Sequence, residues 1–483
     1  MSYLKCSKTF VTATLITVSL GALCAFNAMA FDAGEHALIG NTAFARYMEN
    51  GATSVYPNSI ENLEMDVSYS YGQLMAMSGD MYRSIEEIAL DDAIVMNGFF
   101  KRNRGSLKKC VELEIENIRT KKVYGGCDDI RFVTKKIRYV SLAHDNYSHF
   151  AWHNITKYIE MHGKALWFAR LAHLKCTDEQ KKQDKKGCKT RTKQLKKLVE
   201  DSEYDERLSR KYRKLPKLFP RKKFSQRYFN NMSKERMVRL AIFANAFADH
   251  YLSDAFSAGH LRVPRSQIDS FVLAMEDPEN KKTDKEKERE KGSAVSGALT
   301  QFLHNNDGTM TGIKVTNSLG DKFVIRSDKQ LFAKMGSSEM SGIVEQHPQL
   351  KQPSDAIYKS LKEVFDVIEK GDKAMPKGAY AAFYNVPYII DEKQSLNQVI
   401  QDNIEQKGSI KKAIKSMSQE MQWVFKANTA FGDLDYKQYF SQFIEGIPAM
   451  MDDLRQQIEI ESKESEIKKR IPAKLLTALK KIN

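Results

Sequence analysis

The chain has few of the residues that interrupt helices: 25 Gly and 11 Pro occur among its 483 residues. This shortage, together with apolar residues that recur at helical spacing, predicts a mainly helical protein. The chain also lacks the Gly-x-Ser-x-Gly sequence of serine esterases, the Gly-x-Gly-x-x-Gly sequence of dinucleotide-binding folds and a phosphate-binding Gly-x-x-x-x-Gly-Lys loop. These absences argue against a serine hydrolase and against a nucleotide-binding enzyme.

Beyond residue 30, no stretch is long and apolar enough to cross a bilayer. Residues 1–30 have the three parts of a secretory signal: two lysines, an uncharged apolar run and the small-x-small sequence Ala28-Met29-Ala30. We therefore expect cleavage before Phe31 and a mature protein that is secreted, either extracellular or periplasmic. A membrane anchor, or a lipoprotein modified at Cys24, is the less favoured alternative.

The formal net charge of the whole chain is +15, and removal of the signal with its two lysines leaves +13 (15 − 2). A basic surface suggests contact with an anionic partner, either a membrane or nucleic acid. Solubility alone explains the same charge equally well.

Four cysteines remain after the signal: Cys110, Cys127, Cys176 and Cys188. Their order and modest spacing suggest two local disulfides, Cys110–Cys127 and Cys176–Cys188, formed in an oxidising compartment. Other pairings stay open. A cysteine-based zinc site is disfavoured because no Cys-x-x-Cys pair occurs.

Helical spacing of apolar residues predicts helices at 154–174, 237–256, 356–370 and 442–458. The second of these is apolar almost all round and should be a central buried helix. Residues 311–325 alternate and turn like a β-hairpin, with the bend at 317–321. Charged segments that we expect to be surface insertions lie at about 101–136, 177–234 and 277–292.

The residues that indicate chemistry are His250, Asp254 and His260. The first two are four residues apart and share one face of a helix. If that helix continued, all three side chains would fall within an arc of about 120°, an arrangement that can bind one or two borderline metal ions such as zinc. A buried hydrogen-bonded His–Asp pair is the alternative. The apolar residues 240–248 favour a metal, because buried polar groups need partners.

The pattern His-x3-Asp-x5-His on an apolar helix resembles the core motif of the bacterial zinc-dependent phospholipases C, whose fold is shared with the S1/P1 nucleases. Further segments resemble that family in the same order along the chain: Phe31–His36, Met77–Asp80, Asn146–Phe150 and Leu303–Asp307. The resemblance implies a multi-helix catalytic domain over 31–328, with a small β-hairpin. Residues 329–483 are then expected to form a helical C-terminal extension.

The resemblance also implies a site for up to three Zn²⁺ ions. The first ion would be held by Asp80, His149, His250 and Asp254, and the second by His260, His304 and Asp307. The third would be held by the amine and carbonyl of Phe31, by His36 and by a shared Asp254. Asp80 is also implied to orient the attacking water.

This chain departs from the family pattern in two places. Cleavage exposes Phe31 where the compact members have Trp, which leaves ligation by the backbone unaffected. The closing acid is Asp307, three residues after His304, where the family has Glu four residues after. This shorter arrangement is expected to change the coordination or the preferred metal. His144 is a rival to His149, which we favour because the residue that follows it is Phe.

The residue types suit phosphodiester hydrolysis, because clustered divalent ions offset the charge of the phosphate. The resemblance therefore implies a secreted phospholipase C that cleaves phosphatidylcholine-type glycerophospholipids at a membrane surface, releasing diacylglycerol and a phosphorylated headgroup. Two alternatives stay open. One is a single-strand nuclease of the same fold, with nucleic acid as its partner. The other is a secreted metal-binding protein without turnover. No stable protein partner is implied.

Overall fold

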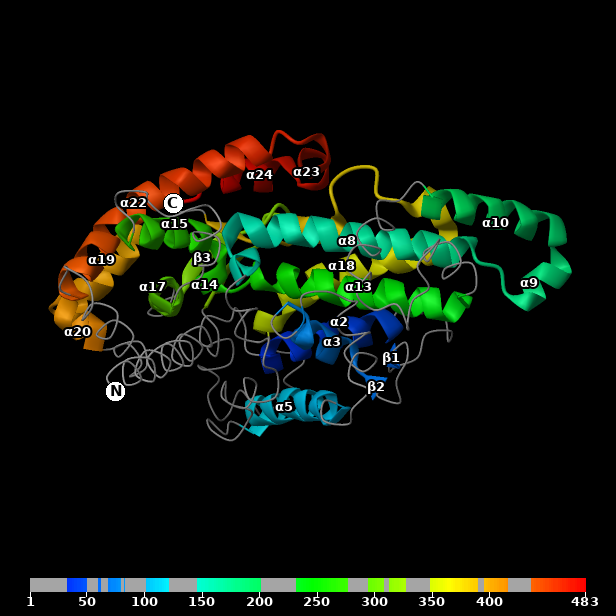
Figure 1. Ribbon diagram of the computed structural model, residues 1–483, viewed down its shortest axis with the longest axis horizontal. Helices are drawn as coiled ribbons and strands as arrows, with labels where there is room; N and C mark the ends of the chain where they lie inside the picture. Colours follow the sequence, from blue (N-terminus) through cyan, green and yellow to red (C-terminus); the bar gives the residue numbers. More distant parts are fainter. Residues whose placement is uncertain are drawn as a thin grey trace, which may run out of the picture.

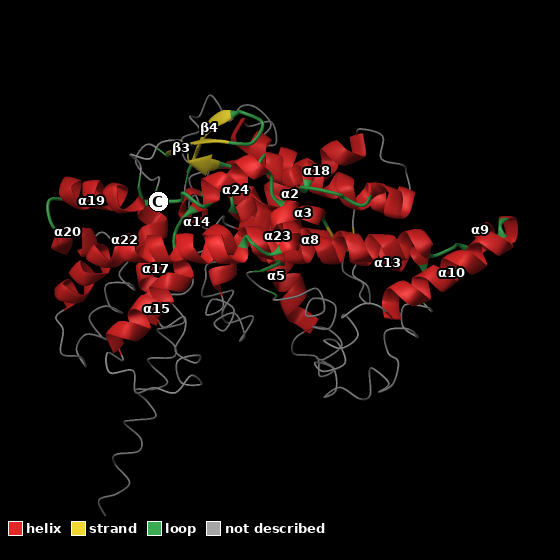
Figure 2. Cartoon of the chain, turned by 90° about the horizontal axis from the view of Figure 1, so that it is seen from above, coloured by secondary structure: helices red, strands yellow, loops and turns green. Residues whose placement is uncertain are grey.

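The computed structural model describes residues 33–49, 60–61, 68–79, 82, 101–120, 146–200, 232–276, 294–307, 312–326, 348–389, 395–415 and 436–483. Within these residues the fold is mainly helical, with one three-stranded and one two-stranded antiparallel sheet (Figures 1 and 2). The prediction of a mainly helical protein is therefore confirmed.

Two long helices, α8 (Ala151–Leu174) and α13 (Lys234–Asp254), lie side by side at the centre of the molecule (Figure 1). Between residues 237 and 254 of α13, every residue except Arg239 is buried. The pair is enclosed by α2 (Ala33–Glu49), α3 (Tyr71–Met77) and α18 (Pro348–Lys370). A helix that is covered on all sides must be apolar on all faces, as the sequence predicted for 237–256.

The other helices extend this body in two directions (Figures 1 and 2). One end carries α9 (Asp178–Gln183) and α10 (Lys185–Glu200). The opposite end carries α15 (Arg265–Glu276), α17 (Ala294–Asn306), α19 (Leu396–Lys407), α20 (Ile410–Lys415) and α22 (Tyr436–Glu461). Shorter elements are η1 (Asn146–His149), α14 (Ala258–Leu261), η4 (Gly371–Ala374), η5 (Ala381–Tyr384), α23 (Ser465–Arg470) and α24 (Ala473–Leu479).

Residues on both sides of the expected boundary at 328 share one hydrophobic core. Leu361 and Phe365 of α18 are fully buried in the same cluster as the apolar residues of α8 and α13. From further along the chain, Glu461 accepts a hydrogen bond of 2.6 Å from the indole nitrogen of Trp152 in α8. The region after residue 328 is therefore packed onto the helical body and shares its core.

The predicted β-hairpin is present as β3 (Ile313–Thr316) and β4 (Lys322–Ile325). Its bend is held by the side-chain oxygen of Asn317, which accepts hydrogen bonds from the backbone N–H groups of Leu319 and Asp321. A third strand that the sequence did not predict, β5 (Tyr388–Ile389), pairs with β3. The separate two-stranded sheet consists of β1 (Ile60–Glu61) and β2 (Ser68–Tyr69). Apolar residues of the hairpin pack on α14, so the sheet supports that short helix.

The expected surface insertions differ in character. In the segment 101–136, the helix α5 (Lys101–Thr120) packs on α2 through one of its sides. Cys110 and Val111 of α5 are fully buried, and Glu114 accepts a hydrogen bond of 3.0 Å from the backbone of Gly34. In the segment 177–234, α9 is exposed and α10 is exposed except on the side that packs against α8, as expected for surface helices. The segment 277–292 lies outside the described residues.

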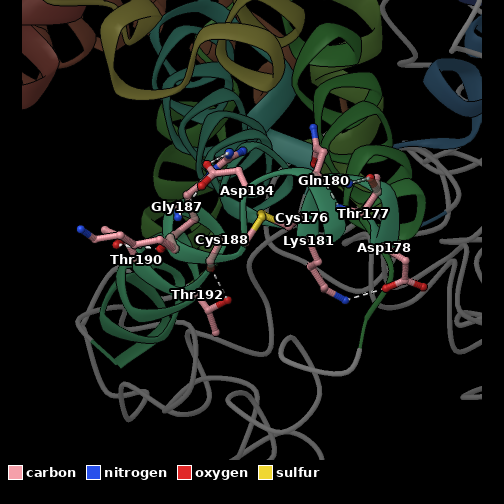
Figure 3. Close-up of a disulfide and its surroundings, with 12 residues drawn as sticks. Cys176, Thr177, Asp178, Gln180, Lys181, Asp184, Gly187, Cys188, Thr190 and Thr192 are labelled. Carbon is pink, nitrogen blue, oxygen red and sulfur yellow. Dashed lines mark hydrogen bonds and ion pairs between the residues drawn. A yellow bond between two sulfur atoms is a disulfide. The ribbon is translucent and has the colours of Figure 1, made fainter.

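The disulfide Cys176–Cys188 is present and confirms one of the two expected pairs (Figure 3). Cys110 is also disulfide-bonded, but Cys127 lies outside the described residues, so the other pair stays a prediction. None of the helices in the described ranges has the length and hydropathy that crossing a membrane requires.

Candidate metal centre

Six of the predicted ligands lie on five different elements that converge at one end of the α8–α13 pair. They are His36 on α2, His149 on η1, His250 and Asp254 on α13, His260 on α14 and His304 on α17. His149 is 3% exposed and the other five side chains are fully buried. Phe31, Asp80 and the rival His144 lie outside the described residues.

Asp254 is the centre of the first group of ligands. Its Oδ1 lies 3.5 Å from His36 Nε2, while its Oδ2 lies 2.9 Å from His149 Nδ1 and 3.8 Å from His250 Nε2. His149 Nδ1 is also 3.1 Å from His250 Nε2. Ligand atoms of His36, His250 and Asp254 all lie within 4.8 Å of one another, so this buried group could hold a metal ion.

The hydrogen bonds behind the rings fix which nitrogen faces Asp254. The Ser253 hydroxyl donates to the backbone oxygen of His250 at 2.7 Å, so it must accept from His36 Nδ1 at 2.8 Å. His250 Nδ1 donates to the backbone oxygen of Met75 at 3.0 Å. Each ring is therefore the tautomer with a lone pair on Nε2. His36 Nε2 lies 3.5 Å from Asp254 Oδ1, while His250 Nε2 lies 3.1 Å from His149 Nδ1 and 3.8 Å from Asp254 Oδ2. An imidazole whose outer nitrogen donates in this way is the usual form of a histidine that ligates a metal.

His260 and His304 form a second group, with their ring centroids 5.0 Å apart. His260 Nδ1 donates to the backbone oxygen of His149 at 2.7 Å, and its ring stacks on Phe150. Its Nε2 is buried without a hydrogen-bond partner in the described part of the chain. His304 lies against Gly259, where an added Cβ would be 2.6 Å from His304 Nε2. Both histidines therefore belong to the centre.

The path of the chain to His260 differs from the single helix considered above. Helix α13 ends at Asp254, and the chain turns through Ala255–Ser257 before α14 begins. The turn is held by a hydrogen bond from the Ser257 N–H to the Asp254 carbonyl, and the Ala258 N–H then donates to Arg326 beside the hairpin. His260 thus reaches the centre through a turn anchored to the sheet, and the arc calculated for a continuous helix does not apply.

Asp307 is occupied by a different interaction. Its two carboxylate oxygens accept hydrogen bonds of 2.7 and 2.9 Å from the guanidinium of Arg262, and both side chains are fully buried. A carboxylate that is bound through both oxygens to a guanidinium is already neutralised. The metal-ligand role implied for Asp307 stays a prediction.

Gly79, the residue before Asp80, lies against two of the ligand rings. A Cβ added to Gly79 would be 2.6 Å from His250 Cδ2 and 2.7 Å from His149 Cε1. The φ angle of Gly79 is +74°, in the region that favours glycine. Close approach and backbone angle therefore both require glycine here. Ala151, two residues after His149, also has a positive φ angle, of 49°, at the point where α8 begins.

Burial determines the charge of the centre. It lowers the pKa of His149 to about 3 and of His250 to about 4, and it lowers the pKa values of His36 and His260 well below the ordinary range. Burial also raises the pKa of Asp254 to about 7, although the nearby His250 opposes the rise. The rings are thus neutral near pH 7, the form that ligates a metal. A nearby divalent ion would favour the ionised carboxylate.

A second buried polar cluster, which the sequence analysis missed, adjoins the centre on α13. Tyr71 donates to Asp249 at 2.5 Å, and the amide of Asn245 donates to the same carboxylate at 2.9 Å. Asn245 Oδ1 lies 2.8 Å from His162 Nδ1, and His162 Nε2 lies 2.9 Å from Glu363. Burial raises the pKa of Asp249 to about 7. The available signal was the pair Asn245 and Asp249, four residues apart on an otherwise apolar helix.

Comparison with known proteins adds no relative from which a role could be transferred: no family model, no curated protein and no solved structure matches the chain.

Proposed function

We propose that the chain is a secreted metal-dependent phosphodiester hydrolase of the zinc-dependent phospholipase C type, acting on phosphatidylcholine-like glycerophospholipids. The observation that carries the proposal is the buried carboxylate of Asp254 with three imidazoles around it. In two of these imidazoles, those of His36 and His250, backbone and hydroxyl acceptors at Nδ1 leave the lone pair on Nε2, on the side of the ring that faces the group.

The donor set fits zinc. Imidazole nitrogens and a carboxylate are ligands that zinc prefers, and the outer hydrogen bonds of His36 and His250 orient the rings for it. Asp254 Oδ1 is buried without a hydrogen-bond partner among the described residues, which is costly for a carboxylate unless a cation lies beside it. His149, His250 and Asp254 would hold one ion, His36 and Asp254 another, and His260 with His304 a third.

When bound, divalent ions lower the pKa of a water molecule and offset the charge of a phosphodiester. The chain's own residues hold the rings neutral by burial and fix their tautomers through Ser253 and Met75. Asp80, which the resemblance implies as the residue that orients the water, follows Gly79, and Gly79 lies against His149 and His250.

A metal-binding protein without turnover is the second candidate, and one observation favours it. Asp307 is bound to Arg262 through both oxygens, which leaves His260 and His304 without the closing acid that the resemblance implies. A nuclease of the same fold would use the same ligands, so the substrate must be tested directly.

The test is to purify the mature protein after expression with its own signal. Bound zinc is measured beside phosphocholine release from phosphatidylcholine vesicles. His250→Ala removes a ligand, and His173→Ala is the matched control, because His173 lies at the far end of α8 and bonds to the backbone of Ile368. We expect two to three zinc ions and a release that is lost only in His250→Ala.

Other results have distinct meanings. Zinc with cleavage of a single-stranded oligonucleotide, but not of lipid, would identify the nuclease. Zinc without either activity would identify the metal-binding protein. If the protein holds no zinc after dialysis against micromolar zinc, the proposal is wrong and the cluster is structural.

A further inference from the structure

Helix α10 carries an unbalanced positive charge. Its 16 residues include six lysines and one arginine, and its single acid is Glu200 at the last position. All six lysines are exposed. Arg191 pairs with Asp184 at 3.6 Å, whereas no ion pair is formed by any of the six lysines within the described ranges.

The lysines occupy one face of the helix. At about 100° per residue, the six side chains of Lys185, Lys186, Lys189, Lys193, Lys196 and Lys197 fall within an arc of about 120°. We call this arc the lysine face. A helix of 16 residues is about 24 Å long, so the lysine face is a straight basic strip of that length.

The apolar side of α10 is already used. Cys188, Leu195 and Val199 are buried, and α10 packs against α8. The centre of this buried side is about 120° from the centre of the lysine face. The helix therefore has no free apolar side to insert into a bilayer, and any contact through the lysine face is electrostatic.

A disulfide near the start of α10 fixes the position of this helix. The disulfide Cys176–Cys188 joins the end of α8 to the first turn of α10 (Figure 3). The intervening turn is closed by Thr177 and Gln180, which cap α9 reciprocally. In both views α9 and α10 form one end of the molecule, beyond the central helices (Figures 1 and 2). A fixed strip at an end can meet a flat surface with several lysines at once.

We propose that the lysine face of α10 docks the protein on the anionic headgroups of a phospholipid membrane. Each lysine near an anionic lipid surface adds to the electrostatic attraction, so several lysines presented together bind where one does not. The inference goes beyond the proposed function, because it concerns where the protein docks and is tested by binding.

Two features favour a membrane over nucleic acid. Helix α10 contains no aromatic residue, and proteins that hold single strands stack bases on aromatic rings. Its exposed cations are lysines, which act as point charges, whereas arginine is the residue whose fork matches individual phosphates. Binding to an anionic membrane surface requires only a high density of positive charge on the protein.

The experiment measures co-sedimentation of the full mature chain with vesicles of phosphatidylcholine alone, and with vesicles containing equal parts of phosphatidylglycerol. The test variant carries Lys186→Gln, Lys189→Gln, Lys193→Gln and Lys197→Gln. A control variant loses the same charge at exposed lysines in and beside α23 and α24, which lie over the middle of the molecule and not at the α10 end (Figure 1), through Lys463→Gln, Lys468→Gln, Lys469→Gln and Lys474→Gln. A third variant replaces the four α10 lysines with arginine.

We expect much stronger binding to the anionic vesicles than to phosphatidylcholine alone, and raised salt should weaken the binding to anionic vesicles. The four glutamines in α10 should lower the partition coefficient by about tenfold or more, while the control and the arginine variant stay close to wild type. Equal loss in the control variant would show that only net charge matters and would overturn the proposal. So would an absence of binding to anionic vesicles, or tighter binding to a DNA oligonucleotide at the same salt. Phosphocholine release from a parallel sample keeps this result separate from the fate of the proposed function.

Discussion

At the scale of single residues, the centre depends on groups that do not face the metal position. Ser253 is the clearest case, because its hydroxyl connects the ring of His36 to the backbone of His250. Ser253 precedes Asp254 in the chain, yet its hydroxyl bonds to the outer nitrogen of His36 and does not face the candidate metal position. Such outer partners orient ligands and tune their basicity.

We predict that Ser253→Ala lowers zinc affinity by about 10- to 100-fold, because His36 loses the acceptor that fixes its tautomer. Ser257→Ala is the matched control, since Ser257 is equally buried and its hydroxyl has no hydrogen-bond partner among the described residues. Competition with a chelator of known affinity measures both. Equal effects of the two substitutions would contradict the positioning role of Ser253.

A second prediction separates backbone strain from contact at Gly79. Gly79→Ala places a Cβ within 2.8 Å of His250 Nε2 at a φ of +74°, whereas Gly320→Ala has a φ of +95° and nothing within 4 Å. Both should lose about 1 kcal/mol of stability from the backbone, as measured by urea unfolding. Only Gly79→Ala should also lose bound zinc. Normal zinc content in Gly79→Ala would mean that the rings can move aside without consequence.

At the scale of elements, sequence patterns predicted what is local. The central helix, the hairpin and the Cys176–Cys188 link each follow from residues close in the chain, and all are present. Three features depend on distant segments and were not foreseen. The buried side of α5 follows from packing on α2, strand β5 pairs across more than 70 residues, and α14 turns away from α13 because the hairpin holds it.

The candidate site shows the same division. The spacing of His250 and Asp254 placed them on one helical face, and the order of segments that resemble the phospholipases C indicated His36, His149 and His304. The resemblance could not show that the guanidinium of Arg262 binds the carboxylate of Asp307. Arg262 lies two residues after His260, and it reaches Asp307 only because the chain turns before α14. Spacing along a chain predicts which residues share one face of a helix, but it does not predict which charged side chain from another element will contact that face.

The link between α8 and α10 gives a prediction at this scale. Replacing both Cys176 and Cys188 with Ala frees a loop of 12 residues, which should cost about 2–3 kcal/mol by the loop-entropy model. We expect the loss to be local: amide hydrogens of α10 should exchange faster, while those of α13 keep their protection. Faster exchange throughout α13 would show instead that the disulfide supports the whole core.

At the scale of the whole molecule, the buried ionisable groups predict how stability depends on pH. The pKa values of five histidines are lowered from 6.5, chiefly by burial: His36, His149, His153, His250 and His260. Each contributes stability that is present above the unfolded pKa of 6.5 and is lost as pH falls below it. Asp249 and Asp254, with pKa values raised from 3.8 to about 7, act in the opposite direction between those values.

Because five histidines oppose two acids, the histidines dominate. We predict that the free energy of unfolding of the metal-stripped protein rises from about pH 4.5 to 6.5, measured by urea unfolding. Bound zinc should steepen the rise, since it needs neutral rings and an ionised Asp254. A free energy that falls over this range would mean that the cluster carries positive charge in the folded state.

The wide spacing of the ligands along the chain also bears on when the centre can form during synthesis. The hydrogen bond between His36 and Ser253 closes a separation of 217 residues, and that between His149 and Asp254 closes 105. A nascent chain that has not yet exposed α13 therefore has the first histidines but no carboxylate between them. If the group holds a metal ion, as proposed, the ion can be acquired only after most of the protein has been made, and a chain exported unfolded would have to draw it from the supply at its destination. The metal available in that compartment, more than the intrinsic preference of the ligands, would then decide which ion the protein carries.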